Sequence, residues 1–389
     1  MRTLLVTGPG GAGRTTAAAA TALGAARRGQ RVLFLTGDPV DWFAPGPGGP
    51  DVRRVDPGAH FRAEVLAFQQ RAATALGMLG AEPLADEELT ELPGSDRFAL
   101  LRALRDAAAG DWDLVVADLP PVRDAIALLA LPEQLRRYLR RLLPPERQAA
   151  RALRPMLAQL AGVPMPAEWL YATAARWDGE LAAVQALLDA PTTTVRLVAE
   201  PGPAAADALR TARAGLALHG RAPELTVANR LLPTTSRDPW LAALAAQQQT
   251  HLKELHRAYE AERAPDTVRE LPHLGLDPRT ADDLAPLDVP PAPARPAPAW
   301  TVEDRRDPDG VLVWRIPLPG AARGDLGLVR RGDELVLTVR PFRRVVSLPS
   351  ALRRCTVSGA ALADGVLSVR FTPDPELWPR ALNGLPPFG

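Results

Sequence analysis

Residues 8–16 read Gly8-Pro9-Gly10-Gly11-Ala12-Gly13-Arg14-Thr15-Thr16, a glycine-rich turn between two segments of different character. The apolar run Leu4-Leu5-Val6 before the turn predicts a strand, and the alanine-rich residues 15–28 after it predict a helix. Glycines allow backbone N–H groups to wrap a phosphate, and the helix N-terminus adds the positive end of its dipole. The segment therefore predicts a phosphate-binding loop.

The candidate phosphate contacts are the backbone N–H groups of this loop and the polar side chains that open the helix. They belong to Gly10, Gly11, Ala12, Gly13, Arg14, Thr15 and Thr16. The Thr15 hydroxyl is the candidate ligand for Mg²⁺. Arg14 stands where the common motif G-x-x-x-x-G-K-T has lysine, and its larger planar head is not equivalent to an ammonium group. The alternative is a strand-to-helix turn that binds no ligand.

The first 285 residues alternate between short apolar runs and helix patterns. The later apolar runs are residues 31–35, 114–117, 194–198 and 225–228. Apolar runs without polar alternation suit a parallel sheet that is covered on both faces. Between about 133 and 190 the leucines recur at helical spacing, so a helical insertion is expected there. The predicted fold is an α/β domain with a parallel sheet over residues 1–285.

The pattern changes after residue 285. Residues 286–299 contain six prolines and predict an extended, semi-rigid linker. Short strand runs separated by turn pairs such as Asp364-Gly365 then predict a small all-β sandwich over 300–373, followed by a tail over 374–389.

Composition excludes several classes of function. The chain has 389 residues and a formal net charge of +1, which argues against nucleic acid as the main partner. Cys355 is the only cysteine, so an intramolecular disulfide and a C-x-x-C zinc site are excluded. The start lacks the features of a signal peptide, and no apolar run reaches the ~18 residues of a membrane span. The expectation is a soluble cytoplasmic protein.

Five motifs, in order, resemble those of the ArsA-type ATPases, which include arsenite-pump subunits and ATPases that target tail-anchored membrane proteins. The loop is similar to the deviant K-G-G-x-G-K-T-T. Thr36-Gly37-Asp38-Pro39 is similar to T-D-P-A-H of switch I, and Leu92-Pro93-Gly94-Ser95-Asp96 is similar to P-G-x-D-E. The run from Asp118-Leu119-Pro120-Pro121 through Leu131-Pro132 is similar to switch II. Val227-Ala228-Asn229-Arg230-Leu231-Leu232-Pro233 is similar to V-N-R-x-x-P. The resemblance spans about 270 residues.

The resemblance implies a P-loop fold that binds ATP or ADP with Mg²⁺. Thr15 would coordinate the magnesium, and Asp118 would contact the ligands of the magnesium rather than the ion itself. Asp38 would orient the attacking water, and Asn229 would hydrogen-bond the edge of the adenine. Taken alone, Asp38 also suits a turn before Pro39, and Asp118 suits a turn at a strand end. The resemblance also implies a homodimer, without the zinc that bridges the dimers of the targeting ATPases.

The sequence departs from the family at its charged positions. Pro9 stands where the family has the lysine that reaches the phosphates of the partner, and Arg14 replaces the lysine of the loop. Asp41 replaces the histidine of switch I, and Val122-Arg123-Asp124 replace T-G-H of switch II. Such charge clamps contribute orders of magnitude to the rate. The hypothesis is weak or absent ATP hydrolysis, which a dimer with an active paralogue would restore.

The helical insertion suggests a client. In the targeting ATPases it forms a groove for an apolar helix, and the candidate lining residues here are Met156, Leu157, Leu160, Met165, Trp169, Leu170 and Tyr171. The first interpretation is therefore a nucleotide-regulated chaperone or targeting factor for hydrophobic proteins. An ordinary helical core is the alternative for the insertion. A non-catalytic pseudo-ATPase scaffold and a subunit of an arsenite pump are the alternatives for the chain.

Residues 300–373 resemble the α-crystallin domain of small heat-shock proteins. Ala361-Leu362-Ala363-Asp364-Gly365-Val366-Leu367 is similar to the A-x-x-x-G-V-L signature of that family. Exposed strand edges in such a domain could capture an extended peptide, and a passive packing module is the alternative.

Overall fold

The computed structural model describes most of the chain. The described residues are 1–43, 48–71, 73, 77, 80, 82–143, 167–261, 267–294 and 297–378, without the side chains of 167–170. Two compact units are present. The first comprises Met1–Gly202 and Glu224–Ala294, and the second comprises Pro203–Pro223 and Arg295–Gly389.

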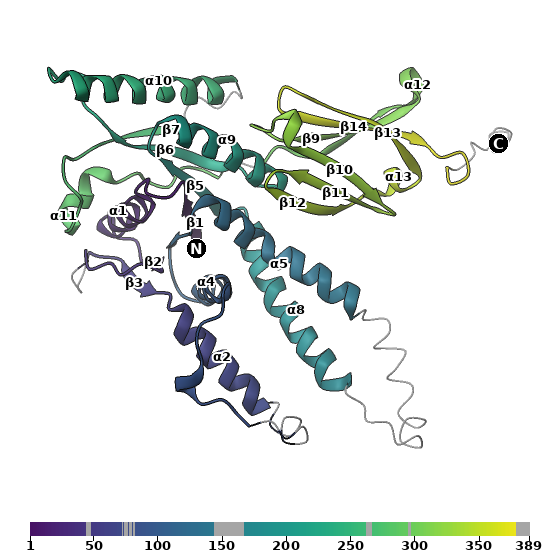
Figure 1. Cartoon of the computed structure of the whole chain (residues 1–389), viewed down its shortest axis with the longest axis horizontal. Coiled ribbons are helices and arrows are strands. Elements are labelled where there is room, and N and C mark those ends of the chain that lie inside the picture. The colour runs from purple at the N-terminus through teal and green to yellow at the C-terminus, as the bar shows by residue number, and fades with distance from the viewer. Residues whose placement is uncertain are drawn as a thin grey trace, which may run out of the picture. The chain divides into compact units, whose positions relative to one another are not determined.

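The first unit is built on a sheet of seven strands in the order β3-β2-β4-β1-β5-β6-β7 (Figure 1). The strands are β1 (Arg2–Thr7), β2 (Val32–Thr36), β3 (Asp51–Arg54), β4 (Leu114–Asp118), β5 (Thr193–Ala199), β6 (Pro223–Leu231) and β7 (Val268–Pro272). β1 pairs in parallel with both β4 and β5, and β2 pairs in parallel with β3 and β4. All five residues of β2 and of β4 are buried, which explains why the apolar runs predicted a covered parallel sheet. The α/β prediction is confirmed.

Helices cover this sheet. They are α1 (Arg14–Arg27), α2 (Pro57–Arg71), α4 (Ser95–Ala108), α5 (Val122–Leu142), α8 (Ala167–Asp189), α10 (Pro239–Ala261) and α11 (Ala281–Leu284), with the 3₁₀ turns η1 (Asp86–Glu88) and η3 (Ala285–Leu287). α1 is the most deeply buried, because its alanines let it lie close to the strands. No helix among the described residues is long and apolar enough to cross a membrane.

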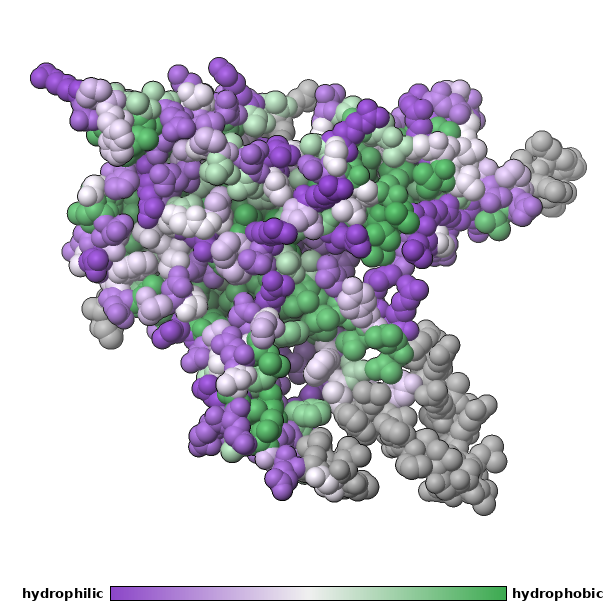
Figure 2. Space-filling view, viewed as in Figure 1, coloured by the Kyte–Doolittle hydropathy of each residue, from purple (hydrophilic) through white to green (hydrophobic). Residues whose placement is uncertain are grey.

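The long helices α5 and α8 pack against each other (Figure 1), and α8 and the C-terminal half of α5 fall within the predicted insertion 133–190. Their outer surfaces keep large apolar side chains exposed, and hydrophobic surface gathers where α2, α5 and α8 project (Figure 2). The exposed side chains there include Phe68, Tyr138, Leu142 and Trp177. Of the predicted groove residues, Met156, Leu157, Leu160 and Met165 lie outside the described residues, as do the side chains of Trp169 and Leu170.

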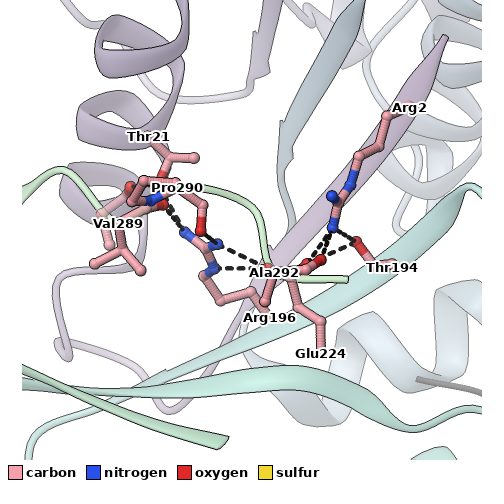
Figure 3. Close-up of polar contacts among 9 residues, drawn as sticks. Arg2, Thr21, Thr194, Arg196, Glu224, Val289, Pro290 and Ala292 are labelled. Atoms are coloured by element: carbon pink, nitrogen blue, oxygen red, sulfur yellow. Dashed lines mark hydrogen bonds and ion pairs between the residues drawn. The ribbon is translucent and has the colours of Figure 1, made fainter. Parts of the chain in front are cut away.

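A buried arginine on β5 joins β6, α1 and residues 289–290 (Figure 3). Arg196 on β5 is fully buried and donates from Nε and Nη2 to Glu224 Oε1, at 3.0 and 2.7 Å. Its Nη1 donates to the hydroxyl of Thr21 on α1 at 2.8 Å. Arg2 donates to Glu224 Oε2 at 2.6 Å, so two arginines share one buried carboxylate.

The same arginines bind the chain that was expected to be a linker. Arg196 donates to the carbonyls of Val289 and Pro290 at 2.7 and 3.0 Å, and Arg2 donates to the carbonyl of Ala292. Val289 is also buried in the core against α1. Of the predicted linker 286–299, the part up to Ala294 therefore groups with the α/β unit. Proline-rich chain leaves carbonyls unpaired, and these are the acceptors that the arginines use.

The second unit is a sandwich of two antiparallel sheets, as predicted. One sheet has the order β10-β11-β12 and the other β13-β14-β9-β8. The strands are β8 (Thr301–Arg305), β9 (Val311–Pro317), β10 (Leu326–Arg331), β11 (Glu334–Val339), β12 (Phe342–Ser347), β13 (Cys355–Ala363) and β14 (Val366–Pro373). Short helical turns connect them, namely α12 (Arg306–Asp309), η4 (Arg323–Asp325) and α13 (Ser350–Arg353). Alternate residues of β11 and β14 are buried, as expected between two packed sheets, whereas β9 buries three consecutive residues, Leu312, Val313 and Trp314.

Helix α9 (Pro203–Leu218) belongs to this second unit, although the sequence placed it within the domain 1–285. Arg344 on β12 donates to the carbonyl of Leu218 at 2.9 Å. Arg210 Nη1 lies 3.6 Å from Asp325 Oδ2, within ion-pair distance. Helical periodicity identified α9 correctly, but it carries no information about which sheet the helix packs on.

His219, at the end of α9, predicts how this unit responds to acid. Burial, with Arg344 and Arg221 nearby, lowers the pKa of His219 to about 3. The unfolded chain therefore takes up a proton below pH ~6.5 that the folded unit excludes, and stability falls as the pH falls. Acidification from pH 7 to 5 should cost about 2 kcal/mol through this residue.

The measurement is hydrogen exchange of β11 and β14 amides at the two pH values. In His219→Gln the difference between the two pH values should shrink, whereas His256→Gln, in the first unit, should leave it unchanged. An equal pH dependence in His219→Gln and the wild type would contradict the assignment.

Candidate functional site

The predicted loop lies where the strand order changes direction. β1 is central, the chain goes from it to β2 on one side, and it returns from β4 to β5 on the other. Ligands of open α/β sheets bind at the carboxyl ends of the strands at such a point. The ends of β1, β2 and β4 here bring Thr7, Thr36 and Asp118 together, and Thr7 Oγ1 donates to the carbonyl of Pro120 at 2.8 Å.

Glycine is required at two positions of the loop. A Cβ on Gly8 would lie 1.8 Å from the carbonyl oxygen of Val198 on β5, so only glycine lets the two strands approach. Gly13 has φ +82° and caps α1, and a Cβ there would lie 2.4 Å from Asn229 Nδ2. The loop is thus shaped by its contacts with β5 and β6 as well as by its own sequence.

Thr15 forms the centre of a polar cluster. Its hydroxyl lies 2.7 Å from Asp118 Oδ2 and 3.1 Å from Asp38 Oδ2. Thr36 Oγ1 also donates to Asp118 Oδ2, at 3.2 Å, and accepts from the backbone N–H of Asp38 at 3.1 Å. Two threonines and two aspartates from three different segments therefore meet at the first turn of α1.

Asp118 is a buried carboxylate with one oxygen, Oδ1, that has no hydrogen-bond partner among the described residues, as expected beside a cation site. Burial raises the pKa of Asp118 to about 6, although the hydroxyl of Thr15 and the charge of Arg14 act in the opposite direction. A magnesium-bound water would supply the missing donor, so the residues fit Mg²⁺. No three His, Cys, Asp or Glu side chains gather as a metal cluster in the described residues, so phosphate and water oxygens would complete the coordination.

Arginines hold the loop from both sides. Arg14 donates from Nη1 to the carbonyl of Leu119, directly after β4. Arg230 donates to the carbonyl of Gly11 at 2.9 Å, although its own φ is +58°, which is unusual for a residue with a side chain. Next to it, Asn229 is buried and donates to the carbonyl of Ala12 at 2.9 Å.

Two hollows border the loop. The first, which we call the α4 cleft, has a volume of about 260 Å³ and is lined by Arg14, Gly37, Asp38, Val55, Pro57, Asp96, Arg97, Leu100, Asp118, Leu119, Pro120, Pro121 and Leu128. The second is much smaller, about 30 Å³, and includes Gly13, Thr16, Asn229, Arg230 and Pro272 in its lining.

The sequence-predicted residues thus fall into two groups. Thr15, Asp38 and Asp118 are in hydrogen-bond contact, while Asn229 lies on the other side of the loop and holds its backbone. Sequence reasoning missed Thr36 as a partner of Asp118. Its position at the end of β2, beside β4 in the sheet, was the available signal.

Two protein-family models match the chain. The model described as "Anion-transporting ATPase" matches residues 1–44 and 51–273, and the model described as "HSP20-like domain found in ArsA" matches residues 309–371. Both matches confirm the resemblances that the motifs predicted.

Several relatives match over nearly the whole chain. An uncharacterized protein of Streptomyces coelicolor is 59% identical over 395 residues, which cover 98% of this chain and 100% of the relative. A protein of Mycobacterium tuberculosis is 31% identical and covers 97% of each chain. A protein of Aquifex aeolicus named "Putative arsenical pump-driving ATPase 1" is 25% identical, over 91% of this chain and 95% of the relative.

Proposed function

Because the chain belongs to the anion-transporting ATPase family, we propose that it binds Mg-ATP and Mg-ADP at the loop 8–16. It hydrolyses ATP slowly or not at all. It uses the bound nucleotide to regulate its binding of hydrophobic protein clients in the cytoplasm. The observation that carries the nucleotide proposal is the Thr15 cluster. Thr15 lies 2.7 Å from Asp118, whose second carboxylate oxygen is buried without a partner. A buried acceptor without a partner calls for a water or an ion, and a water on a bound magnesium would satisfy it here.

The residues of the cluster would share the work at the phosphates. Thr15 would hold Mg²⁺ through its hydroxyl, and Asp118 would accept from a water on the metal. The metal supplies positive charge to the phosphates when bound. Asp38 would orient a water for attack, which suits its exposed position 3.1 Å from Thr15.

Slow hydrolysis is expected because few positive side chains are free to stabilise the charge on the phosphates during the reaction. Pro9 provides none, and Arg14 is hydrogen-bonded to the Leu119 carbonyl. The family's T-G-H of switch II is Val122-Arg123-Asp124 here, so its histidine is replaced by an acid. A homodimer would therefore lack both lysines, and a dimer with an active paralogue would regain the lysine that is supplied in trans.

The client proposal rests on the exposed apolar side chains of α5 and α8, which include Tyr138, Leu142 and Trp177. The HSP20-like unit offers strand edges as a second surface for extended chains. A non-catalytic scaffold would present the same surfaces, and it differs from a regulated chaperone only in its response to nucleotide.

An anion pump subunit is a weaker alternative, although a relative's name mentions one. Arsenite favours thiolates, and the only cysteine, Cys355, lies in the β unit. Burial raises the pKa of its thiol, which keeps it protonated.

Calorimetric titration with Mg-ATP and Mg-ADP tests the proposal. We expect both nucleotides to bind, with different affinities, and an ATPase rate far below that of active family members. Absence of heat at millimolar nucleotide would overturn nucleotide binding and favour the scaffold. A rate equal to that of active members, abolished by Asp38→Asn, would overturn slow hydrolysis.

A further inference from the structure

We propose that Arg97 supplies, from the same chain, the second positive charge that faces the terminal phosphate of ATP. The proposal rests on the proposed nucleotide function and deepens it, because it assigns the group that distinguishes ATP from ADP. Arg97 lies in the first turn of α4 and lines the α4 cleft together with Arg14, Asp38 and Asp118.

The charge of the cleft requires such a group. Its lining contains three acids, Asp38, Asp96 and Asp118, and two arginines. Arg14 already donates to the carbonyl of Leu119, and Pro9 contributes no charge. A terminal phosphate brought into this cleft would face three acidic side chains, whose charge a bound metal would offset only locally, and Arg97 is the remaining cation of the lining. Its planar head can bind two phosphate oxygens at once.

Arg97 is held loosely enough to turn towards a phosphate. Its Nη2 lies 3.2 Å from Asp124 Oδ1 on α5, with side chains that are 37% and 53% exposed. Exposed ion pairs of this kind contribute about 0–1 kcal/mol to stability. A phosphate dianion therefore competes effectively with the single carboxylate of Asp124 for the guanidinium of Arg97. Asp124 follows the cleft residue Pro121 by three positions in the chain. The ion pair with Asp124 therefore holds the guanidinium of Arg97 at the edge of the cleft.

The backbone beneath Arg97 is fixed, so only its side chain has to move. Gly94 caps α4 with φ +94°, and the N–H of Arg97 donates to the Gly94 carbonyl at 3.2 Å. Ser95, Leu100 and Leu101 are buried and anchor the helix. The guanidinium therefore exchanges one anionic partner for another from a fixed attachment point.

The test compares ATP and ADP in calorimetric titrations of the full chain with Mg²⁺. Arg97→Met keeps the apolar stem and removes the charge. We expect it to weaken Mg-ATP binding by about 10- to 100-fold, the value of a charge-assisted hydrogen bond, and to leave Mg-ADP within about twofold of wild type. Arg97→Lys should retain part of the preference, and Asp124→Asn should strengthen ATP binding by releasing the arginine.

Arg102→Met is the matched control. Arg102 lies on the same helix, is equally exposed and is paired with Glu64, but it does not line the cleft. It should leave both affinities unchanged. If Arg97→Met weakens ATP and ADP equally, or neither, the assignment of Arg97 is overturned while nucleotide binding stands. If the wild-type protein binds neither nucleotide, the proposed function fails, and the assignment of Arg97 fails with it.

Discussion

Glu224→Ala lowers the free energy of unfolding of the α/β unit by about 3–5 kcal/mol, the largest effect on stability that we expect from one substitution. Glu224 is the only carboxylate that contacts the fully buried Arg196 in the described residues, and it also pairs with Arg2. Without it, Arg196 keeps a charge that burial already disfavours, since desolvation lowers the pKa of this arginine. Denaturant unfolding, with hydrogen exchange of β5 and β6 amides, measures the loss.

Two further variants separate this mechanism from simple loss of packing. Arg196→Met in the Glu224→Ala background should restore part of the stability, because it removes the unpaired charge. Asp282→Ala breaks an ion pair in the same unit between Arg27 and a carboxylate that is 94% exposed, and it should cost less than about 1 kcal/mol. Equal losses in Asp282→Ala and Glu224→Ala, or a further loss on adding Arg196→Met, would contradict the expected role of the buried pair.

Thr15→Ala should remove the part of nucleotide affinity that depends on magnesium, about 10- to 100-fold. The hydroxyl of Thr15 is the donor to Asp118 and the proposed ligand of the metal, and alanine provides neither function. Thr15→Ser keeps the hydroxyl and should bind as the wild type does. Calorimetric titration of Mg-ADP and of ADP with a chelator measures the difference.

The controls for Thr15 use the same two titrations. Affinity for ADP in the presence of the chelator should be equal in wild type and Thr15→Ala, because the backbone N–H groups of the loop remain. A Thr15→Ala protein with full magnesium dependence would show that the metal is held elsewhere. Loss of binding in Thr15→Ser as well would assign Thr15 a structural role in the loop.

How far the sequence predicts the fold depends on the kind of signal. Leu4-Leu5-Val6 and the other central strands were found because each is buried on both faces and has no polar alternation. β3, with the sequence Asp51-Val52-Arg53-Arg54, was missed because it is an exposed edge strand. Charged residues suit such an edge, since they discourage pairing with other chains, but they leave no hydrophobic signal.

The candidate site shows the same division. Thr15, Asp38 and Asp118 were predicted by their place in the motifs, and the structure brings them within hydrogen-bond distance. The pair Arg97–Asp124 was not predicted, since its members lie on different helices 27 positions apart. No periodicity relates residues whose only link is that both helices start beside the same cleft.

The sequence by itself determined the local features: the glycine turn after β1, the buried parallel strands, the order of the motifs and the Asp364-Gly365 hairpin, whose residues both have positive φ. These follow from backbone freedom and from hydrophobic periodicity, which act over a few residues. The tertiary structure alone decided that α9 joins the β unit and that Arg196 fixes residues 289–290. It also gave Asp118 its raised pKa. Each depends on partners far away in the chain, because burial and charge pairing exist only once the strands have assembled.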